Sequence, residues 1–86
     1  ATAGAARPQV EVIGQYVYLL WKRFNGISID LLTRYSNDKG KIWSEDKIIA
    51  TTKNGSDHPD WVRDGDDLYA SWQTLAEGLK LMKVTQ

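Results

Sequence analysis

Hydrophobic and polar residues alternate along much of the chain with the period of two that is typical of β-strands. Ile27, Ile29 and Leu31, for example, alternate with polar residues. Short turn sequences separate these stretches, and Asn25-Gly26 is a strong hairpin signal because both residue types tolerate a positive φ. The pattern therefore predicts a chain of short strands joined by tight turns.

The alternation and the turn signals predict seven strands in two groups. The first group has strands at residues 9–13, 16–24 and 27–35, and a fourth within 42–52. The second group has strands at residues 61–64, 67–74 and 79–84. Because short turns join consecutive strands into antiparallel hairpins, we expect a four-stranded and a three-stranded antiparallel sheet.

A sequence repeat relates the two groups. The pattern Gly-x-x-Val/Leu-Tyr-x-x-Trp occurs at residues 14–21 and again, 51 positions later, at residues 65–72. A period near 50 residues is typical of β-propellers, whose blades are four-stranded antiparallel sheets. We therefore expect an all-β fold with one full blade at residues 9–52 and three strands of a second blade within residues 56–86. Residues 1–8 are expected to be a leader or a disordered segment.

The composition narrows the classes of function. The chain has 86 residues, a formal net charge of zero and no cysteine, so disulfides and zinc–thiolate sites are excluded. No basic patch stands out, and we expect no nucleic-acid partner. No apolar run approaches the roughly 20 residues that span a bilayer, and we expect no membrane partner. The Asp-rich turn at residues 64–67 lacks the spacing of a calcium loop, so we expect neither a metal nor another cofactor.

A turn motif, Ser-x-Asp-x-Gly-x-x-Trp, lies between the third and fourth predicted strands at residues 36–43. Asp38 is expected to accept hydrogen bonds from the backbone of its own turn, and Ser36 to add another local hydrogen bond. Gly40 supplies the positive φ that the turn needs. Trp43 is expected to fold back as an apolar plug. The chemistry of this motif is therefore structural.

This motif resembles the Asp-box (BNR) repeat of the sialidase superfamily, and residues 55–59, 64–74 and 77–78 resemble the C-terminal part of bacterial sialidase-like propellers. The resemblance implies a six-bladed β-propeller, a secreted or periplasmic location in a bacterium, and a parent protein that acts on glycans. Members of the superfamily include hydrolases of the exo-glycosidase type and non-catalytic carbohydrate-binding proteins. The arginine triad, Tyr–Glu pair and Asp acid/base of the sialidases have no residue-by-residue match here, so we do not expect this chain alone to be active.

Propeller geometry predicts where a site would form. The Asp-box and the turn after the first strand of each blade share one rim, and sites usually lie on the opposite rim. The predicted turns at that opposite rim are residues 23–26, 54–59 and 74–78. The candidate glycan-facing residues in or next to these turns are Arg23, Asn25, Asp57, His58, Trp61, Thr74 and Glu77.

Several candidates have structural alternatives. His58, the single histidine, is either a general acid or base oriented by Asp57 or a loop residue that precedes Pro59. Glu77 is either a sugar-binding carboxylate or a polar turn residue. Trp61 either stacks on a sugar or packs between blades. In each case we favour the structural interpretation.

The repeat has further consequences. Tyr18 and Tyr69 occupy equivalent positions and are expected to be packing residues, and the equivalent Trp21 and Trp72 are expected to be core residues. The spacing between Trp21 and the first Asp-box, applied to Trp72, places the start of a second Asp-box just beyond Gln86. We therefore expect the second blade to lack its outer strand, which leaves an unpaired edge.

Three hypotheses for the function follow. The chain is a fragment or subunit of a sialidase-like propeller whose parent acts on glycans, or an oligomeric, lectin-like glycan-binding module, or a structural or protein-interaction propeller. A ring needs about four to eight blades. The expected partners are therefore the rest of a longer propeller or other copies of the chain, together with a glycan under the first two hypotheses.

Overall fold

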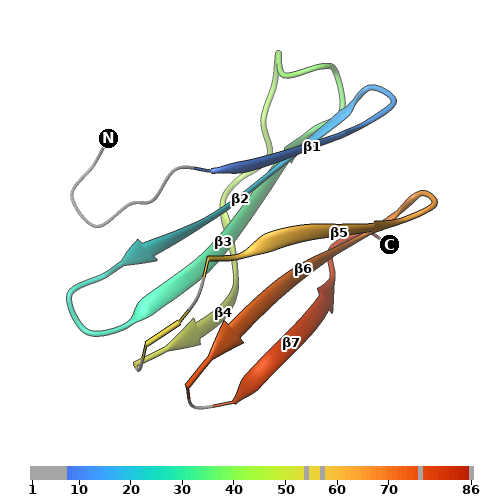
Figure 1. Ribbon diagram of the computed structural model, residues 1–86. Helices are drawn as coiled ribbons and strands as arrows, with labels where there is room; N and C mark the ends of the chain where they lie inside the picture. The colour runs from blue at the N-terminus through green and yellow to red at the C-terminus, as the bar shows by residue number, and fades with distance from the viewer. Residues whose placement is uncertain (1–7, 54, 57, 76, 86) are drawn as a thin grey trace.

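The computed structural model shows seven β-strands among the residues it describes, which are 8–53, 55–56, 58–75 and 77–85 (Figure 1). The first antiparallel sheet contains β1 (Gln9–Ile13), β2 (Tyr16–Phe24), β3 (Ile29–Ser36) and β4 (Lys47–Thr52). The second contains β5 (Asp60–Asp64), β6 (Asp67–Thr74) and β7 (Gly78–Lys83). In each sheet, strands that follow one another in the chain are neighbours. No helix in the described part of the chain is long and apolar enough to cross a membrane.

The all-β class, the two antiparallel sheets and their strand order are as the sequence predicts. Several strand boundaries differ from the prediction: β3 and β7 differ at both ends, β5 begins one residue earlier, and β4 occupies only the last part of the range 42–52. The third strand begins at Ile29, because the side-chain oxygen of Asn25 accepts hydrogen bonds from the backbone N–H groups of Ile27 and Ser28, at 2.9 Å each. These bonds hold the residues before β3 in a turn. The fourth strand begins only at Lys47, some residues after the turn motif.

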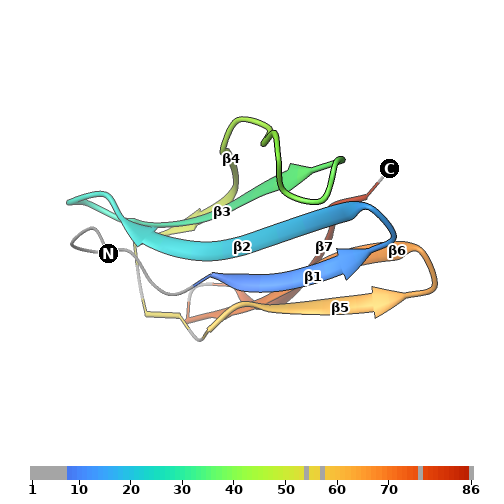
Figure 2. The ribbon, with the colours of Figure 1, turned by 90° about the horizontal axis from the view of Figure 1, so that it is seen from above.

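The hydrophobic core lies between the two sheets, which stack as layers (Figure 2). Its fully buried members are Leu20 and Leu31 from the first sheet and Ala70 and Trp72 from the second, each at most 1% exposed. Partly buried side chains pack around them: Ile29, Ile49, Ala50, Trp61, Met82 and Val84. Because side chains alternate between the two faces of a strand, this core takes one face from each sheet.

The first strands of the two sheets, β1 and β5, lie side by side (Figure 2). The indole Nε1 of Trp61 donates to the carbonyl of Gln9 at 3.1 Å, and Nη1 of Arg63 donates to the carbonyl of Val12 at 3.3 Å. Arg63 also forms an ion pair with Glu11 at 3.6 Å. Side chains of β5 therefore tie the second sheet to the backbone of β1.

The two sheets stack with unlike faces in contact. In β6, the side chains of Leu68, Ala70 and Trp72 face the first sheet and are at most 1% exposed. The equivalent positions of β2 alternate with the core residue Leu20, so they point away from the second sheet and are half-buried. The prediction of a core residue is therefore correct for Trp72 and wrong for Trp21. Both tryptophans lie on the same face of their own sheet, but among the described residues only that of Trp72 is covered by another sheet.

The connection between β6 and β7 is shorter than the one between β2 and β3. As a result Val84 lies opposite Leu68, and the N–H of Val84 donates to the carbonyl of Leu68 at 2.8 Å. The same place in the first sheet, opposite Val17, belongs to Ser36. The prediction that a second Asp-box begins just beyond Gln86 is therefore wrong, because the equivalent position is Val84, which has no hydroxyl.

The outer faces of both sheets carry exposed apolar side chains. They are Val10, Val12 and Ile48 on the first sheet, and Val62, Leu79 and Leu81 on the second, each between 42% and 59% exposed except Leu79 at 64%. Each sheet therefore buries one face and leaves apolar area on the other.

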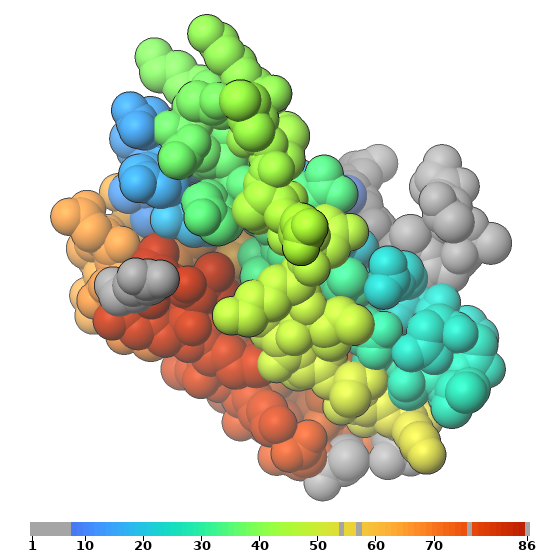
Figure 3. Space-filling view, turned by 180° about the vertical axis from the view of Figure 1, so that it is seen from behind, coloured from blue at the N-terminus to red at the C-terminus, as the bar shows by residue number. Residues whose placement is uncertain are grey.

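A hollow of about 230 Å³ lies between β4 and the end of β7, on the side shown in Figure 3.

Replacing Trp72 by alanine is expected to lower the free energy of unfolding by about 3–5 kcal/mol, because it leaves a cavity in the centre of the core. Trp21→Ala is the matched control at the equivalent position of the first sheet, where the side chain is half-buried, and is expected to cost clearly less. Urea unfolding followed by circular dichroism measures both effects. Equal losses for the two variants would contradict the assignment of the faces.

Candidate functional site

Hydrogen bonds within the turn at residues 36–43 fix its shape. The Ser36 hydroxyl oxygen accepts from the backbone N–H of Gly40 at 2.8 Å and lies 2.7 Å from Oδ1 of Asp38, to which it donates. The same Asp38 oxygen accepts from the N–H groups of Lys41 and Ile42 at 3.1 and 2.9 Å. One serine and one aspartate thus satisfy most of the donors in this turn.

The backbone and the neighbours of this turn complete its geometry. Both Lys39 (φ 62°) and Gly40 (φ 94°) adopt the left-handed region, which strains any residue with a side chain. A Cβ at Gly40 would lie 3.6 Å from the Trp43 ring. The N–H of Lys39 donates to the carbonyl of Gln15 at 3.0 Å. The turn motif therefore lies against the β1–β2 turn at one end of the first sheet.

These hydrogen bonds also set the electrostatics of the turn. The Ser36 hydroxyl, then the N–H groups of Ile42 and Lys41, lower the pKa of Asp38 below its ordinary value. Donors that bind the charged form favour it over the neutral acid. Asp38 therefore serves as a hydrogen-bond acceptor for the backbone of its own turn.

At the opposite end of the first sheet, Asp30 is the centre of a polar cluster. Asp30 is 5% exposed, and its carboxylate accepts from Nδ2 of Asn25 at 3.2 Å and from the Thr51 hydroxyl at 2.9 Å. Arg23 lies 3.8 Å away as an ion-pair partner. Sequence reasoning selected Arg23 and Asn25 but missed Asp30, because its register opposite Arg23 cannot be read from local pattern alone.

The partners of this cluster limit its chemistry. Asn25 uses its side-chain oxygen to hold its own turn and its nitrogen to bind Ser28 and Asp30. The Asp30 oxygens accept hydrogen bonds from two residues, Asn25 and Thr51, and form an ion pair with Arg23. Arg23, with its side chain 41% exposed, is accessible to a ligand, as are the exposed residues Asn25 and Thr51.

The segment between the two sheets meets the β6–β7 turn at this same end. Ser56 and Thr74 form an isolated β-bridge, and the N–H of Leu75 donates to the carbonyl of Gly55 at 2.9 Å. The Lys22 ammonium reaches across from β2 and donates to the Ser56 hydroxyl at 3.3 Å. The structure thus brings together two of the three predicted turns, at residues 55–56 and 74–75.

Thr74 and Glu77 take part in the β6–β7 turn itself. Thr74 is 3% exposed, and its hydroxyl oxygen accepts from the N–H of Glu77 at 3.1 Å. The Glu77 carboxylate pairs with Lys80 at 2.8 Å. Both side chains therefore have local structural partners.

The remaining candidates do not converge on one place. Trp61 packs against the core and forms a T-shaped pair with Tyr18, with 6.2 Å between ring centroids. His58 is exposed and borders a shallow hollow on the outer face of the second sheet, with Asp60 and Gln73 among its other lining residues. Asp57, predicted to orient His58, lies outside the described residues.

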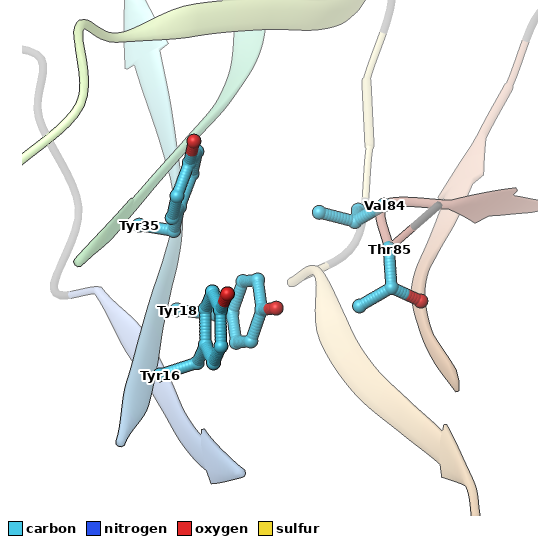
Figure 4. A pocket seen from close by; sticks show the side chains of 5 residues that line it. All are labelled: Tyr16, Tyr18, Tyr35, Val84 and Thr85. Carbon is cyan, nitrogen blue, oxygen red and sulfur yellow. The ribbon is translucent and has the colours of Figure 1, made fainter. Parts of the chain in front are cut away.

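A hollow that sequence reasoning missed lies between the two sheets, at the end that carries the turn motif. Tyr16, Tyr18 and Tyr35 line one side of it, and Val84 and Thr85 line the other (Figure 4). The three ring centroids lie 6.1–6.4 Å apart, with 14–31° between ring planes. The hollow has a volume of about 340 Å³. The sequence did not predict this hollow, because only the β2–β3 register brings Tyr35 next to Tyr16 and Tyr18.

Among the described residues, no group of three or more His, Cys, Asp and Glu side chains is arranged to hold a metal ion. Comparisons of the chain with protein-family models, with curated proteins and with solved structures found no match.

The turn motif predicts a pH dependence of stability. Since the pKa of Asp38 is lowered in the folded state, its stabilising contribution is complete above the unfolded value of about 3.9 and is lost as the pH falls through the lower folded value. Asp38→Asn is expected to be less stable than the unsubstituted chain at pH 7, and this difference should shrink in acid. Urea unfolding of both proteins at pH 7 and in acid measures this difference in stability. A difference that persists unchanged in acid would contradict this account.

Proposed function

We propose that this chain is part of a sialidase-like Asp-box propeller, secreted or periplasmic in a bacterium, whose parent acts on glycans. The observation that carries the proposal is the turn at residues 36–43, in which Ser36 and Asp38 bind the backbone that Gly40 and Trp43 shape. This is the structural role that the sequence assigns to an Asp-box. Two sheets related by a repeat and stacked in the same sense are consistent with adjacent blades.

The proposal does not extend to catalysis by this chain alone. Glycosidases commonly need two carboxyl groups that face the scissile bond. Asp30 and Glu77 are already paired with Arg23 and Lys80, and Asp38 is committed to its own turn. An active parent would therefore supply most of the catalytic groups from outside this chain.

The outer faces of the two sheets support partners that continue the stack. The face of the first sheet that carries Trp21 is equivalent to the buried face that carries Trp72. Another sheet like the first could cover the face that carries Trp21, just as Leu20 of the first sheet covers Trp72. The partner is either the rest of a longer propeller or further copies of the chain, of which three would supply six sheets, a number within the range of known propellers.

A lectin-like ring without catalysis is the second candidate, and it is favoured by the same outer faces. Contacts between unlike faces close into a ring or continue as an open array. A structural or protein-interaction propeller is the third candidate, and binding to glycans separates it from the other two.

A glycan array probed with the chain is expected to show binding to at least one class of sugar. A fluorogenic sialoside is expected to remain uncleaved by the chain alone, since no complete set of catalytic groups is proposed in it. Absence of binding to every glycan would contradict the first two candidates and support the third. Turnover of the sialoside would overturn the claim that the catalytic apparatus is incomplete.

Sedimentation velocity tests the outer faces. If copies of the chain complete the stack, the mass exceeds the 9.7 kDa of one chain, and Leu79→Lys on the outer face of the second sheet lowers it toward that value. Ile27→Lys is the matched control, because Ile27 is exposed in a turn and lies outside these faces; its mass should be unchanged. A single-chain mass at all concentrations would contradict the ring of copies and leave the longer propeller as the proposal.

A further inference from the structure

The tyrosine hollow has the features of a binding site. It lies between the sheets, bordered by Tyr16, Tyr18 and Tyr35 on one side and by Val84 and Thr85 on the other (Figure 4). Its volume of about 340 Å³ is near the lower end of the roughly 300–1,000 Å³ of small-molecule sites. A ligand of one or two small rings is therefore the right size for it.

Tyr18 is the residue that points to a ligand. It is 9% exposed, and its ring extends from β2 into the hollow (Figure 4). The described residues contain no buried side-chain nitrogen or oxygen that lacks a hydrogen-bond partner, so the Tyr18 hydroxyl, for which no protein partner is found among them, is open to the hollow. A ligand hydroxyl in the hollow could form a hydrogen bond with it.

The lining of the hollow is neutral. All five lining residues are uncharged at neutral pH, and burial together with the neighbouring Tyr16 and Tyr35 raises the pKa of Tyr18 above its ordinary value. The Tyr18 hydroxyl therefore keeps its proton and can donate it. Because an ionised ligand would lose its hydration without gaining an opposite charge here, the site favours an uncharged ligand.

The remaining groups define the chemistry of this ligand. Tyrosine rings pack against apolar C–H groups and offer hydroxyls at their tips. The hydroxyl of Thr85 accepts from the N–H of Leu68 at 2.9 Å and keeps its own proton to donate. A pyranose has both matching features, because it carries an apolar C–H face and several hydroxyl groups.

We propose that the tyrosine hollow binds one pyranose residue of an uncharged glycan. The proposal rests on the proposed function as a glycan-directed propeller and deepens it. It places the sugar at the end of the sheets that carries the turn motif, away from the predicted turns around Asn25 and Glu77. It also selects a neutral sugar over a sialic acid, whose carboxylate has no cation among the five lining residues.

Isothermal titration calorimetry of the full chain tests the site. The probes are the methyl glycosides of glucose, galactose and N-acetylglucosamine, with N-acetylneuraminic acid as the anionic comparison. At least one neutral glycoside is expected to bind more tightly than the anionic sugar. Tyr18→Phe, which removes one hydroxyl and keeps the ring, is expected to weaken binding of that glycoside by about tenfold.

Tyr69→Phe is the matched control, because Tyr69 is the repeat equivalent of Tyr18, lies on the outer face of the second sheet and does not line the hollow. It is expected to leave binding unchanged, and circular dichroism of both variants verifies that they fold. Neutral sugars that bind equally well to Tyr18→Phe would overturn the hollow as the site while glycan recognition stands. Tighter binding of N-acetylneuraminic acid would overturn the selection for neutral sugars. If no probe binds although the glycan array shows binding, the hollow alone is overturned; if the array is also negative, the proposed function falls with it.

Discussion

The packing of Trp72 against Leu20 and Leu31 is the interaction on which the rest of the structure depends. A chain of 86 residues buries a modest share of its surface, and a single three- or four-stranded sheet has no second layer to cover its apolar face. Trp72, 1% exposed, is the largest fully buried side chain in the layer that joins the two sheets. The hollow between the sheets and the identity of the outer faces both follow from this stacking.

The stacking joins unlike faces, and this has consequences beyond the core. If like faces met, the two faces left outside would be equivalent to each other. Instead the face of Trp21 on one side and the face of Leu79 on the other remain uncovered. The same arrangement leaves a hollow at the end of the sheets, with Tyr18 on one side of it and Val84 on the other. The proposed assembly therefore uses the uncovered outer faces, and the proposed ligand site is the hollow between the sheets.

Local sequence predicted the elements well, because alternation and turn residues act over a few positions. The strands from Gln9 to Phe24 and β6 have the predicted bounds. Features that depend on register or on which face is covered were not predictable in this way. Trp21 and Trp72 have the same pattern and different burial, and Asp30 joins Arg23 only through the pairing of β2 with β3.

Nuclear Overhauser effects from the Trp72 indole test the central claim most directly, because they report which face of the first sheet meets the second. The account predicts cross-peaks from the Trp72 ring protons to the methyl groups of Leu20 and Leu31. Cross-peaks from Trp72 to the methyl groups of Val17 and Leu19 would show that like faces meet, and would contradict the account.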